Sequence, residues 1–447
     1  MTGSGASPRE PSGPGVPRSK LPRPVLVLLA LACLLGLLDL LFYTALIPLL
    51  PHYTKHAGMT KTGAGVLIAA YPAGALVGAL PGGFATARFG GRVVAVIGLL
   101  LMSGAMLVFG WAAAPTVLQA ARFIQGLGGA FALGAGMAWL ASVAPPDRRG
   151  ELLGTAAGAA VVGALLGPPV GTLASHVGTG PAFSSAAAAG TILIVAAFLV
   201  KRPHAAPPQG LRSAWHALRD REVALGIWLI IVPGLAFGVL DVLAPLRLAR
   251  LGATAAVIGG TLLGAAAIES ALSPLAGRLS DRHGALTPVR ISLATAVAVS
   301  LLAPLLGPTP VLVGLLVIGL PAYGTLLAPG SAMLSAGAQR VGLHQGLAFG
   351  LVNLAWAGGQ TIAAAASGAL AQATAELVPF ALLAAACLAT LVTLQLGASR
   401  RARQRQGAAD QVVLGAGRLL LARLVTDQAA DSCRCPPQLG MVASRPL

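Results

Sequence analysis

The sequence of 447 residues is poor in charge, in aromatic side chains and in cysteine. Charged residues make up only 10% of it, whereas a soluble domain carries roughly 25%, so the composition excludes an ordinary soluble protein. The four cysteines provide no disulfide framework, and the single Cys-x-Cys of Cys433 and Cys435 supplies too few ligands for a metal site. We expect no metal and no cofactor.

In place of charge, the chain has long apolar runs. Hydrophobic residues make up 56% of it, and the mean hydropathy is +0.82. A membrane-spanning helix needs about 20 apolar residues, and runs of that length are too long for strands of a membrane barrel. We therefore expect an all-α membrane protein with twelve transmembrane helices in two six-helix, pseudo-symmetric bundles. The predicted spans are 25–50, 62–85, 92–112, 116–142, 152–174, 182–200, 223–246, 253–277, 288–307, 310–334, 343–371 and 376–396.

A polar stretch, residues 201–222, divides the spans six and six. The expected organisation is an N-terminal tail at 1–24, bundles at 25–200 and 223–396 around a central loop at 201–222, and a basic tail at 397–447. The first apolar run has spanning length and follows a Pro- and Gly-rich basic segment, so it indicates a first helix and not a cleavable signal peptide.

The formal net charge of +17 could suggest a nucleic-acid partner, but the basic residues alternate between loops. Four are predicted on the outer side, at Lys55, Lys61, Arg247 and Arg250. Those predicted on the inner side are Arg9, Arg18, Lys20, Arg23, Arg88, Arg92, Arg148, Arg149, Lys201, Arg202, Arg212, Arg219, Arg221, Arg278, Arg282, Arg290 and Arg340. This asymmetry is the positive-inside pattern, so we expect both termini in the cytoplasm and no nucleic-acid partner.

The two halves carry similar segments. Gly36-Leu-Leu-Asp39-Leu-Leu in the first predicted helix is echoed by Gly238-Val-Leu-Asp241-Val-Leu in the seventh, and the loop after the second helix is echoed after the eighth. Six-helix repeats in parallel relation are the plan of an alternating-access transporter, whose substrate site lies between the repeats near the midplane of the membrane.

Four charged residues lie well inside predicted spans, away from the span ends: Asp39, Asp241, Glu269 and Arg122. A charge at the bilayer centre costs roughly 3 kcal/mol or more, so each is a functional candidate. Structural alternatives remain: Asp39 could hydrogen-bond the backbone, and Glu269 lies close enough to the inner loop to snorkel. Arg122 keeps its proton and needs an acid or several carbonyls; Asp39 is the leading candidate for its partner. Desolvation raises the pKa of a buried carboxyl group, and a nearby cation lowers it. A carboxyl group balanced between these two effects can exchange a proton for a cationic substrate.

Residues 25–396 resemble the major facilitator superfamily, and within it the drug:proton antiporters and the related vesicular amine transporters. Leu118-Gln-Ala-Ala-Arg122-Phe-Ile-Gln125-Gly126-Leu-Gly128-Gly129-Ala130 is similar to the helix 4 motif of these exporters, whose Arg is implicated in proton transfer. The residues similar to the helix 5 antiporter signature are Gly154, Gly163, Gly167, Pro168 and Gly171. The glycines give a flat packing face, and the proline allows a kink.

The family's gating loop reads Gly-x-Leu-Ala-Asp-Arg-x-Gly-Arg-Arg/Lys. The loop after the second span matches it at Gly83, Arg88, Gly90 and Arg92, but Ala87 stands where the family has Asp. The second copy keeps the pattern at Asp281, Arg282 and Gly284. We therefore expect the cytoplasmic gate to depend on the second copy.

Helices 1 and 7 are similar to those of the amine transporters, whose first-helix Asp contacts the substrate amine. The resemblance places Asp39 and Asp241 in such roles, whereas the family's acid in helix 11 falls on Asn353, which cannot carry a proton. The proton path would then use the two aspartates, with Glu269 as a further candidate. The expected cavity lining is Phe42, Tyr43, Phe237, Trp356 and Gln360.

The predicted function is a proton-coupled antiporter that exports lipophilic cations or amines, by alternating access, from the inner membrane of a bacterium. Its expected partners are the small-molecule substrate, protons and membrane lipid, and we expect a monomer. An exporter of a sugar or another neutral metabolite is the alternative, with Asn353 and Gln360 as recognition residues. A membrane enzyme is disfavoured because the predicted spans hold no Ser/His pair, His cluster or metal-ligand set; a scaffold or receptor role stays open.

Overall fold

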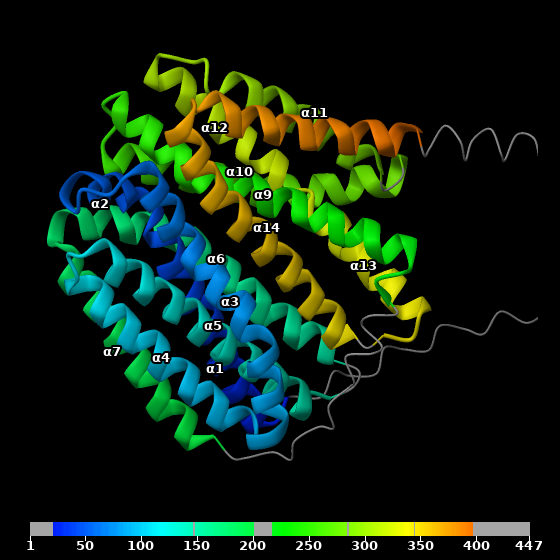
Figure 1. Ribbon diagram of the computed structural model, residues 1–447. Coiled ribbons are helices and arrows are strands. Elements are labelled where there is room, and N and C mark those ends of the chain that lie inside the picture. Colours follow the sequence, from blue (N-terminus) through cyan, green and yellow to red (C-terminus); the bar gives the residue numbers. More distant parts are fainter. Residues whose placement is uncertain (1–20, 146–147, 201–216, 284–285, 344, 397–447) are drawn as a thin grey trace, which may run out of the picture. The chain divides into compact units, whose positions relative to one another are not determined.

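The computed structural model describes residues 21–145, 148–200, 217–283, 286–343 and 345–396 (Figure 1). In this part of the chain every regular element is a helix, as the sequence predicts. Contacts divide the chain into two compact units, residues 1–388 and 389–447. The first unit holds α1 to α14, and the described part of the second is the end of the helical segment Leu377–Leu396.

The helices before the central loop form what we call the first half: α1 (Arg23–Ala45), η1 (Ile47–Leu49), α2 (Leu50–His56), α3 (Lys61–Phe89), α4 (Gly91–Trp111), α5 (Pro115–Val143), α6 (Arg149–Val177) and α7 (Thr179–Leu199). Those of the second half are α9 (Arg221–Arg250), α10 (Ala255–His283), α11 (Leu286–Leu302), α12 (Thr309–Gly324), α13 (Leu327–Arg340) and α14 (Gln345–Ala373), followed by Leu377–Leu396. The division into two six-helix domains stays a prediction.

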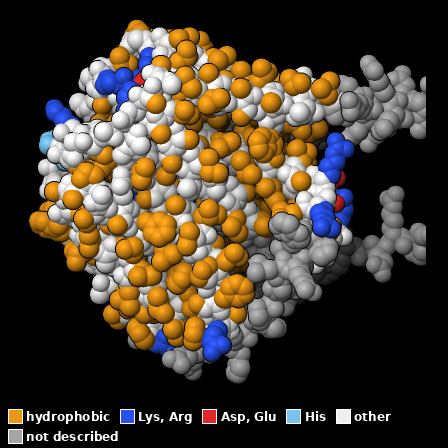
Figure 2. All heavy atoms as spheres, in the orientation of Figure 1, with side chains coloured by type: hydrophobic (Ala, Val, Ile, Leu, Met, Phe, Trp, Pro, Cys, Tyr) orange, Lys and Arg blue, Asp and Glu red, His pale blue; other side chains and the backbone are white. Residues whose placement is uncertain are grey.

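Ten described helical segments are long and apolar enough to cross a membrane. The two other predicted spans correspond to α11, an apolar helix of 17 residues, and to α14, which has 29 residues. Many large apolar side chains are exposed on these helices; Ile192 is 69% exposed and Ile318 is 67% exposed. Figure 2 shows hydrophobic side chains over the middle of one face, with Lys and Arg toward its edges. Lipid contact explains this surface.

Two predicted spans are interrupted helices. The first is α-helical only to Ala45, and the chain continues through η1 and α2 as far as His56, so the segment extends beyond the predicted end at residue 50. Pro48 and Pro51, which lack a backbone N–H, lie in this transition. The tenth predicted span breaks after Gly324 into α12 and α13, where the N–H of Leu326 bonds to the carbonyl three residues back.

Glycines let the helices approach closely. In the first half α1 packs on α5 and α6, and α5 packs on α3 and α4; in the second half α9 packs on α13 and α14. A Cβ added at Gly163, Gly167 or Gly171 of α6 would collide with the backbone of α1. The halves meet where α3 packs on α14 and α6 packs on α10.

Candidate functional site

Seven polar side chains form one buried cluster, which we call the carboxyl–tyrosine network. Its members are Asp39, Tyr43, Tyr71, Arg122, Gln125, Asp241 and Gln360, and none is more than 8% exposed. The first half supplies them from α1, α3 and α5, and the second half supplies them from α9 and α14. The network therefore spans the contact between the halves.

Asp39 lies on α1 and receives a hydrogen bond from the hydroxyl of Tyr71 on α3, with 2.8 Å between the oxygens. Its other carboxylate oxygen, Oδ1, is buried and has no hydrogen-bond partner among the described residues. The carboxylate rests against Gly129 of α5, where any side chain would collide with it. A second glycine of the same motif, Gly126, lets α5 approach the backbone carbonyl of Tyr71.

Asp241 lies on α9 and accepts two hydrogen bonds. The Tyr43 hydroxyl of α1 and the Gln360 amide of α14 each donate to its Oδ2 at 3.2 Å. Gln360 also donates to the Tyr43 hydroxyl. One hydroxyl group of the first half is thus held by an acid and an amide of the second half.

The two tyrosines join the acids. The rings of Tyr43 and Tyr71 are stacked, with centroids 4.5 Å apart and an interplanar angle of 29°. Because Tyr71 bonds to Asp39 and Tyr43 bonds to Asp241, a continuous chain of contacts runs from one buried carboxyl group to the other.

Arg122 lies beside this stack and is fully buried. Its guanidinium carbon is 5.4 Å from the ring centroid of Tyr43 and 5.3 Å from that of Tyr71, within the range of cation–π contact. It donates to the backbone carbonyls of Phe42 and Tyr43 and to the side chain of Gln125. No ion pair joins Arg122 to Asp39 among the described residues. Of the two alternatives that the sequence leaves open, an acid or several carbonyls, the carbonyls accept its hydrogen bonds.

The charges of the network are unequal in number. It contains two carboxyl groups and one guanidinium group, and all three residues are at most 3% exposed. An arginine stays protonated in a protein, so two ionised aspartates would leave one negative charge uncompensated. An unbalanced charge in a lipid-like interior is costly. The network can therefore take up one further positive charge, either a proton or a cationic group.

The other predicted site residues are not members of the network. Phe237 and Trp356 form an aromatic pair with centroids 5.3 Å apart, and both are half-buried. Asn353, on α14, is exposed. Glu269 is half-buried on α10, where its carboxylate packs against Gly324 at the end of α12. Phe42 is buried beside Phe183, and its backbone carbonyl binds Arg122.

The predicted gating residues differ in their surroundings. Gly90, between α3 and α4, has a φ of +85°, which favours glycine. Arg88 lies over Phe89, and Arg92 lies over Phe198 and donates to its carbonyl. Gly83 and Gly154 have open space where a side chain would be. Asp281 and Arg282 belong to α10, but their side chains and all of Gly284 lie outside the described residues.

A cluster of charges at the predicted outer end links the halves. Glu376 pairs with Lys61 at 3.0 Å and with Arg247 at 3.4 Å, and it also binds Arg250. Lys61 begins α3 of the first half, and the other three residues belong to the second half. Burial raises the pKa of Glu376, but hydrogen bonds from Arg250 and Lys61 outweigh it, and the net result is a lowered pKa.

Sequence reasoning missed Tyr71 and Glu376. Tyr71 is a polar side chain within an apolar run, a weak signal because tyrosine is also common in ordinary cores. Glu376 and Lys61 look like ordinary charges at the ends of spans. Gln125 was part of the predicted helix 4 motif, but no role was assigned to it.

Comparison with known proteins gives consistent results. The family model of the Major Facilitator Superfamily matches residues 32–344. The chain is 26% identical over 157 residues to Multidrug resistance protein 2 of Bacillus subtilis (strain 168), which covers 35% of this chain and 39% of that protein. It is also 26% identical over 168 residues to Quinolone resistance protein NorA of Staphylococcus aureus (strain MRSA252), covering 37% and 43% of the two chains. The match thus spans about two fifths of the length of these relatives.

Solved structures support the same fold. The crystal structure of the nucleoside transporter NupG matches with a TM-score of 0.65 and 14% sequence identity, covering 84% of this chain and 99% of that one. At this identity the likeness shows the fold alone. Together with the family match, it agrees with the predicted arrangement of transmembrane helices.

Proposed function

The chain belongs to the major facilitator superfamily, and we propose that it is a proton-coupled antiporter that exports lipophilic cations or amines by alternating access. We place it in the inner membrane of a bacterium with both termini in the cytoplasm, in keeping with the loop charges and the bacterial relatives. The two relatives are named for resistance to multiple drugs and to quinolones, which favours drug-like cargo.

The observation that carries the proposal is the charge balance of the carboxyl–tyrosine network. Two buried carboxyl groups share one buried guanidinium group, so the network is neutral only when it holds one more positive charge. A proton and a substrate ammonium group satisfy this need equally well, and they exclude each other. Competition for one position is the physical basis of antiport, since a proton entering from outside displaces the cation that is to leave.

The buried oxygen Oδ1 of Asp39 is the position we propose for this exchange. Within the described part of the chain it has no hydrogen-bond partner, whereas the Oδ2 of the same carboxyl group accepts a hydrogen bond from Tyr71. A cation bound at Oδ1 would lie close to the aromatic stack of Tyr43 and Tyr71, whose ring faces favour positive charge. Arg122 is fixed by two backbone carbonyls. Its permanent positive charge compensates the negative charge of the second acid.

Alternating access requires the halves to move apart at one end while they close at the other. In this structure Asp241 and Gln360 of the second half hold Tyr43 of the first half, so separation of the halves would break these bonds. We propose that occupancy of the network by a proton or by substrate changes the strength of this connection and so couples the chemistry to the movement.

Neutral substrates are the second candidate. Gln360 donates hydrogen bonds inside the network and could bind a sugar or another neutral polar molecule in the same way. Substitution of Asp39 by Asn separates the two candidates. Cation export by the unaltered protein that is lost in the variant supports the antiporter, whereas transport of neutral cargo but not of cations by the unaltered protein favours the alternative.

The direct experiment is transport by the purified protein in proteoliposomes with an imposed pH gradient, over a panel of amines, cationic dyes and sugars. We expect amine or dye movement in one direction and proton movement in the other. Asp39→Asn and Asp241→Asn should each lower gradient-driven flux at least about tenfold, because each removes an exchangeable charge worth roughly 1.4 kcal/mol or more.

The matched control is Glu151→Gln, which also neutralises one acid but at an exposed position paired with Arg148. It should leave gradient-driven flux unchanged. If the double variant Asp39→Asn/Asp241→Asn transports cations as the unaltered protein does, the proposed mechanism is wrong.

A further inference from the structure

A cavity of about 520 Å³ lies at the predicted outer end, between the halves. Its wall in the first half includes Pro48, Leu49 and Lys55, and its wall in the second half includes Leu246, Arg250 and Ile258. The volume lies within the range of about 300–1,000 Å³ that is usual for small-molecule sites. The cavity is separate from the carboxyl–tyrosine network, none of whose residues lines it.

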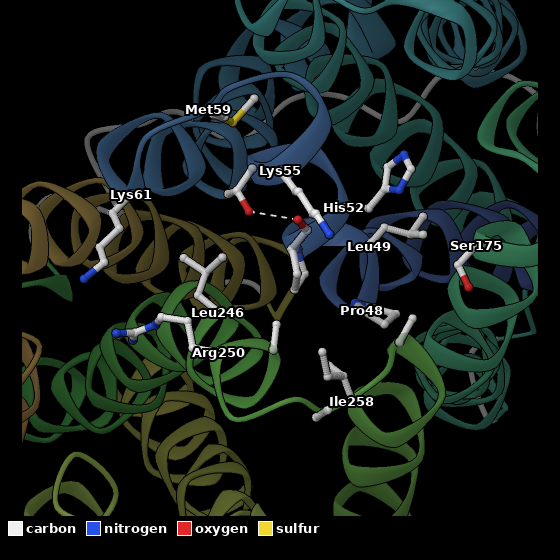
Figure 3. A pocket seen from close by; sticks show the side chains of 15 residues that line it. Pro48, Leu49, His52, Lys55, Met59, Lys61, Ser175, Leu246, Arg250 and Ile258 are labelled. Carbon is white, nitrogen blue, oxygen red and sulfur yellow. Dashed lines mark hydrogen bonds between the residues drawn. The ribbon is translucent and has the colours of Figure 1, made fainter. Parts of the chain in front are cut away.

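The charged groups of the cavity are mostly positive. Lys55, Lys61 and Arg250 line it, together with His52. Among the described residues, the acid paired with this group is Glu376, which Lys61 and Arg250 share with Arg247. Lys55 is exposed and belongs to no ion pair among the described residues. Figure 3 shows its side chain extending toward the cavity, while Lys61 and Arg250 lie together on one side of it.

We propose that this cavity binds an amphipathic organic anion, a small molecule with an apolar body and one carboxylate, sulfonate or phosphate group. The anionic group would contact Lys55 and balance the excess positive charge, and the apolar body would lie against Pro48, Leu49 and Ile258. A lipophilic cation, the cargo of the proposed function, would be repelled from the same walls. The ligand of this cavity is therefore not the exported cargo, and the site is regulatory.

Its position between the halves determines the effect of such a ligand. The cavity has the end of the first predicted span and α2 on one side and the end of α9 with the start of α10 on the other. Movement of the halves apart at this end would separate its walls. A ligand that binds only one conformation shifts the population toward it, so the anion would hold this end closed and inhibit turnover. This inhibition rests on the proposed function, whereas binding does not.

Binding is measured by isothermal titration calorimetry of the full chain in phosphatidylcholine nanodiscs without any gradient. The probes are 2-naphthalenesulfonate, the matched cation 1-naphthylmethylammonium, and inorganic sulfate. We expect saturable binding of the sulfonate and at least about tenfold weaker binding of each of the other two. Lys55→Gln should weaken the sulfonate about fivefold, the order expected for one partly shielded charge contact.

Two further variants test the location. Ser175→Phe places a large side chain in the cavity wall at an exposed position and should also weaken binding. Arg23→Gln removes an exposed cation at the start of α1, outside the cavity, and should leave binding unchanged. Equal binding of the sulfonate by the Lys55→Gln variant and the unaltered protein would overturn the assignment, and so would preferential binding of the naphthyl cation.

Nanodiscs containing phosphatidylglycerol distinguish a soluble ligand from a lipid headgroup. If the sulfonate binds equally well in them, the ligand is a soluble anion, as proposed. Competition by phosphatidylglycerol would assign the cavity to lipid and overturn the proposal. A sulfonate that fails to bind while proton-driven cation export persists refutes this inference alone, and binding without any transport refutes only the proposed function.

Discussion

The hydroxyl group of Tyr71 binds the first buried acid, Asp39. The ring of Tyr71 is part of an aromatic stack that leads to the second buried acid, Asp241. Tyr71 donates to Asp39, and its ring lies against that of Tyr43, which in turn donates to Asp241. A hydrogen bond to an ionised group contributes about 1.5–3 kcal/mol, roughly twice a neutral one. Tyr71 is therefore expected to position Asp39 and not merely to fill the core.

Tyr71→Phe removes this hydroxyl group and keeps the ring. We expect gradient-driven transport to fall roughly tenfold or more, because neither oxygen of Asp39 would then have a hydrogen-bond donor among the residues that the structure describes. Flux in proteoliposomes as a function of pH is the measurement, and its pH profile should change as well as its rate.

The control for this change is Tyr323→Phe. Tyr323 is also buried, and its hydroxyl bonds to Ser300 and to the carbonyl of Ala296, away from the network. Its loss should lower thermal stability without altering the pH profile of transport. The positioning role of Tyr71 fails if the two variants behave alike.

Among the site residues, the acids were predictable and their partners were not. Asp39, Asp241 and Arg122 stand out in any reading of the sequence because charges in apolar spans are rare and costly. Which side chain meets which depends on helix rotation and depth, which a run of apolar residues leaves open. The sequence therefore paired Arg122 with Asp39, whereas the packed helices bring Arg122 to carbonyls and Asp39 to Tyr71.

Within the single helix α6, the glycines of the motif lie in two different surroundings. Gly163, Gly167 and Gly171 lie against the backbone of α1, and close approach there requires the absence of a side chain. Gly154 belongs to the same motif, but nothing lies within 4 Å of the position its Cβ would take. The motif is thus a packing surface only over its C-terminal part.

Gly163→Ala should therefore destabilise the protein, by about 1–3 kcal/mol for overpacking, because the added methyl group meets the backbone carbonyl of Leu37. Thermal unfolding in detergent is the measurement, and the expected result is a lower Tm. Gly154→Ala adds the same methyl group to the same helix in open space and should leave Tm unchanged or raise it. A similar drop in both variants would indicate a general effect on helix α6 and would contradict close packing as the cause.

The helix interruptions were also beyond the sequence prediction. The tenth predicted span reads as one apolar run, yet it divides between α12 and α13. Gly324 at this point accommodates the carboxylate of Glu269 from α10. Apolar length predicts that a segment crosses the membrane, but the place where it breaks depends on what packs beside it.

At the scale of the whole first unit, the two halves are held by one acid and three cations. Glu376 binds Lys61 of the first half and Arg247 and Arg250 of the second. The network provides another polar connection, through Tyr43, Asp241 and Gln360. The ion cluster lies at the ends of the helices and the network lies within them, so each can be altered without the other.

Glu376→Gln should lower the thermal stability of the protein at neutral pH, because three cations lose their shared partner. Since the pKa of Glu376 is lowered from its ordinary value of 4.5, its stabilising effect is fully present above that value. It disappears as the pH falls through the lowered pKa. The difference in Tm between the two proteins should accordingly be constant near neutral pH and shrink below about pH 4.5.

Scanning calorimetry between pH 7 and pH 3.5 measures this difference, with Glu151→Gln as the control for an exposed ion pair. A difference in Tm that persists unchanged at the lowest pH would contradict a role for the ionised carboxylate. High salt should reduce the effect only in part, because Glu376 is 8% exposed.

The sequence by itself determined the class of the protein, the approximate positions of its apolar helical segments, and the acids that lie within them. These features follow from local composition: apolar length, loop charge and rare intramembrane charges each depend on neighbouring residues along the chain. Only the tertiary structure decided that Tyr71 binds Asp39, that Tyr43 and Gln360 meet at Asp241, and that Glu376 joins the halves. Such contacts join residues up to 317 positions apart, and they depend on how each helix is rotated and shifted against its neighbours.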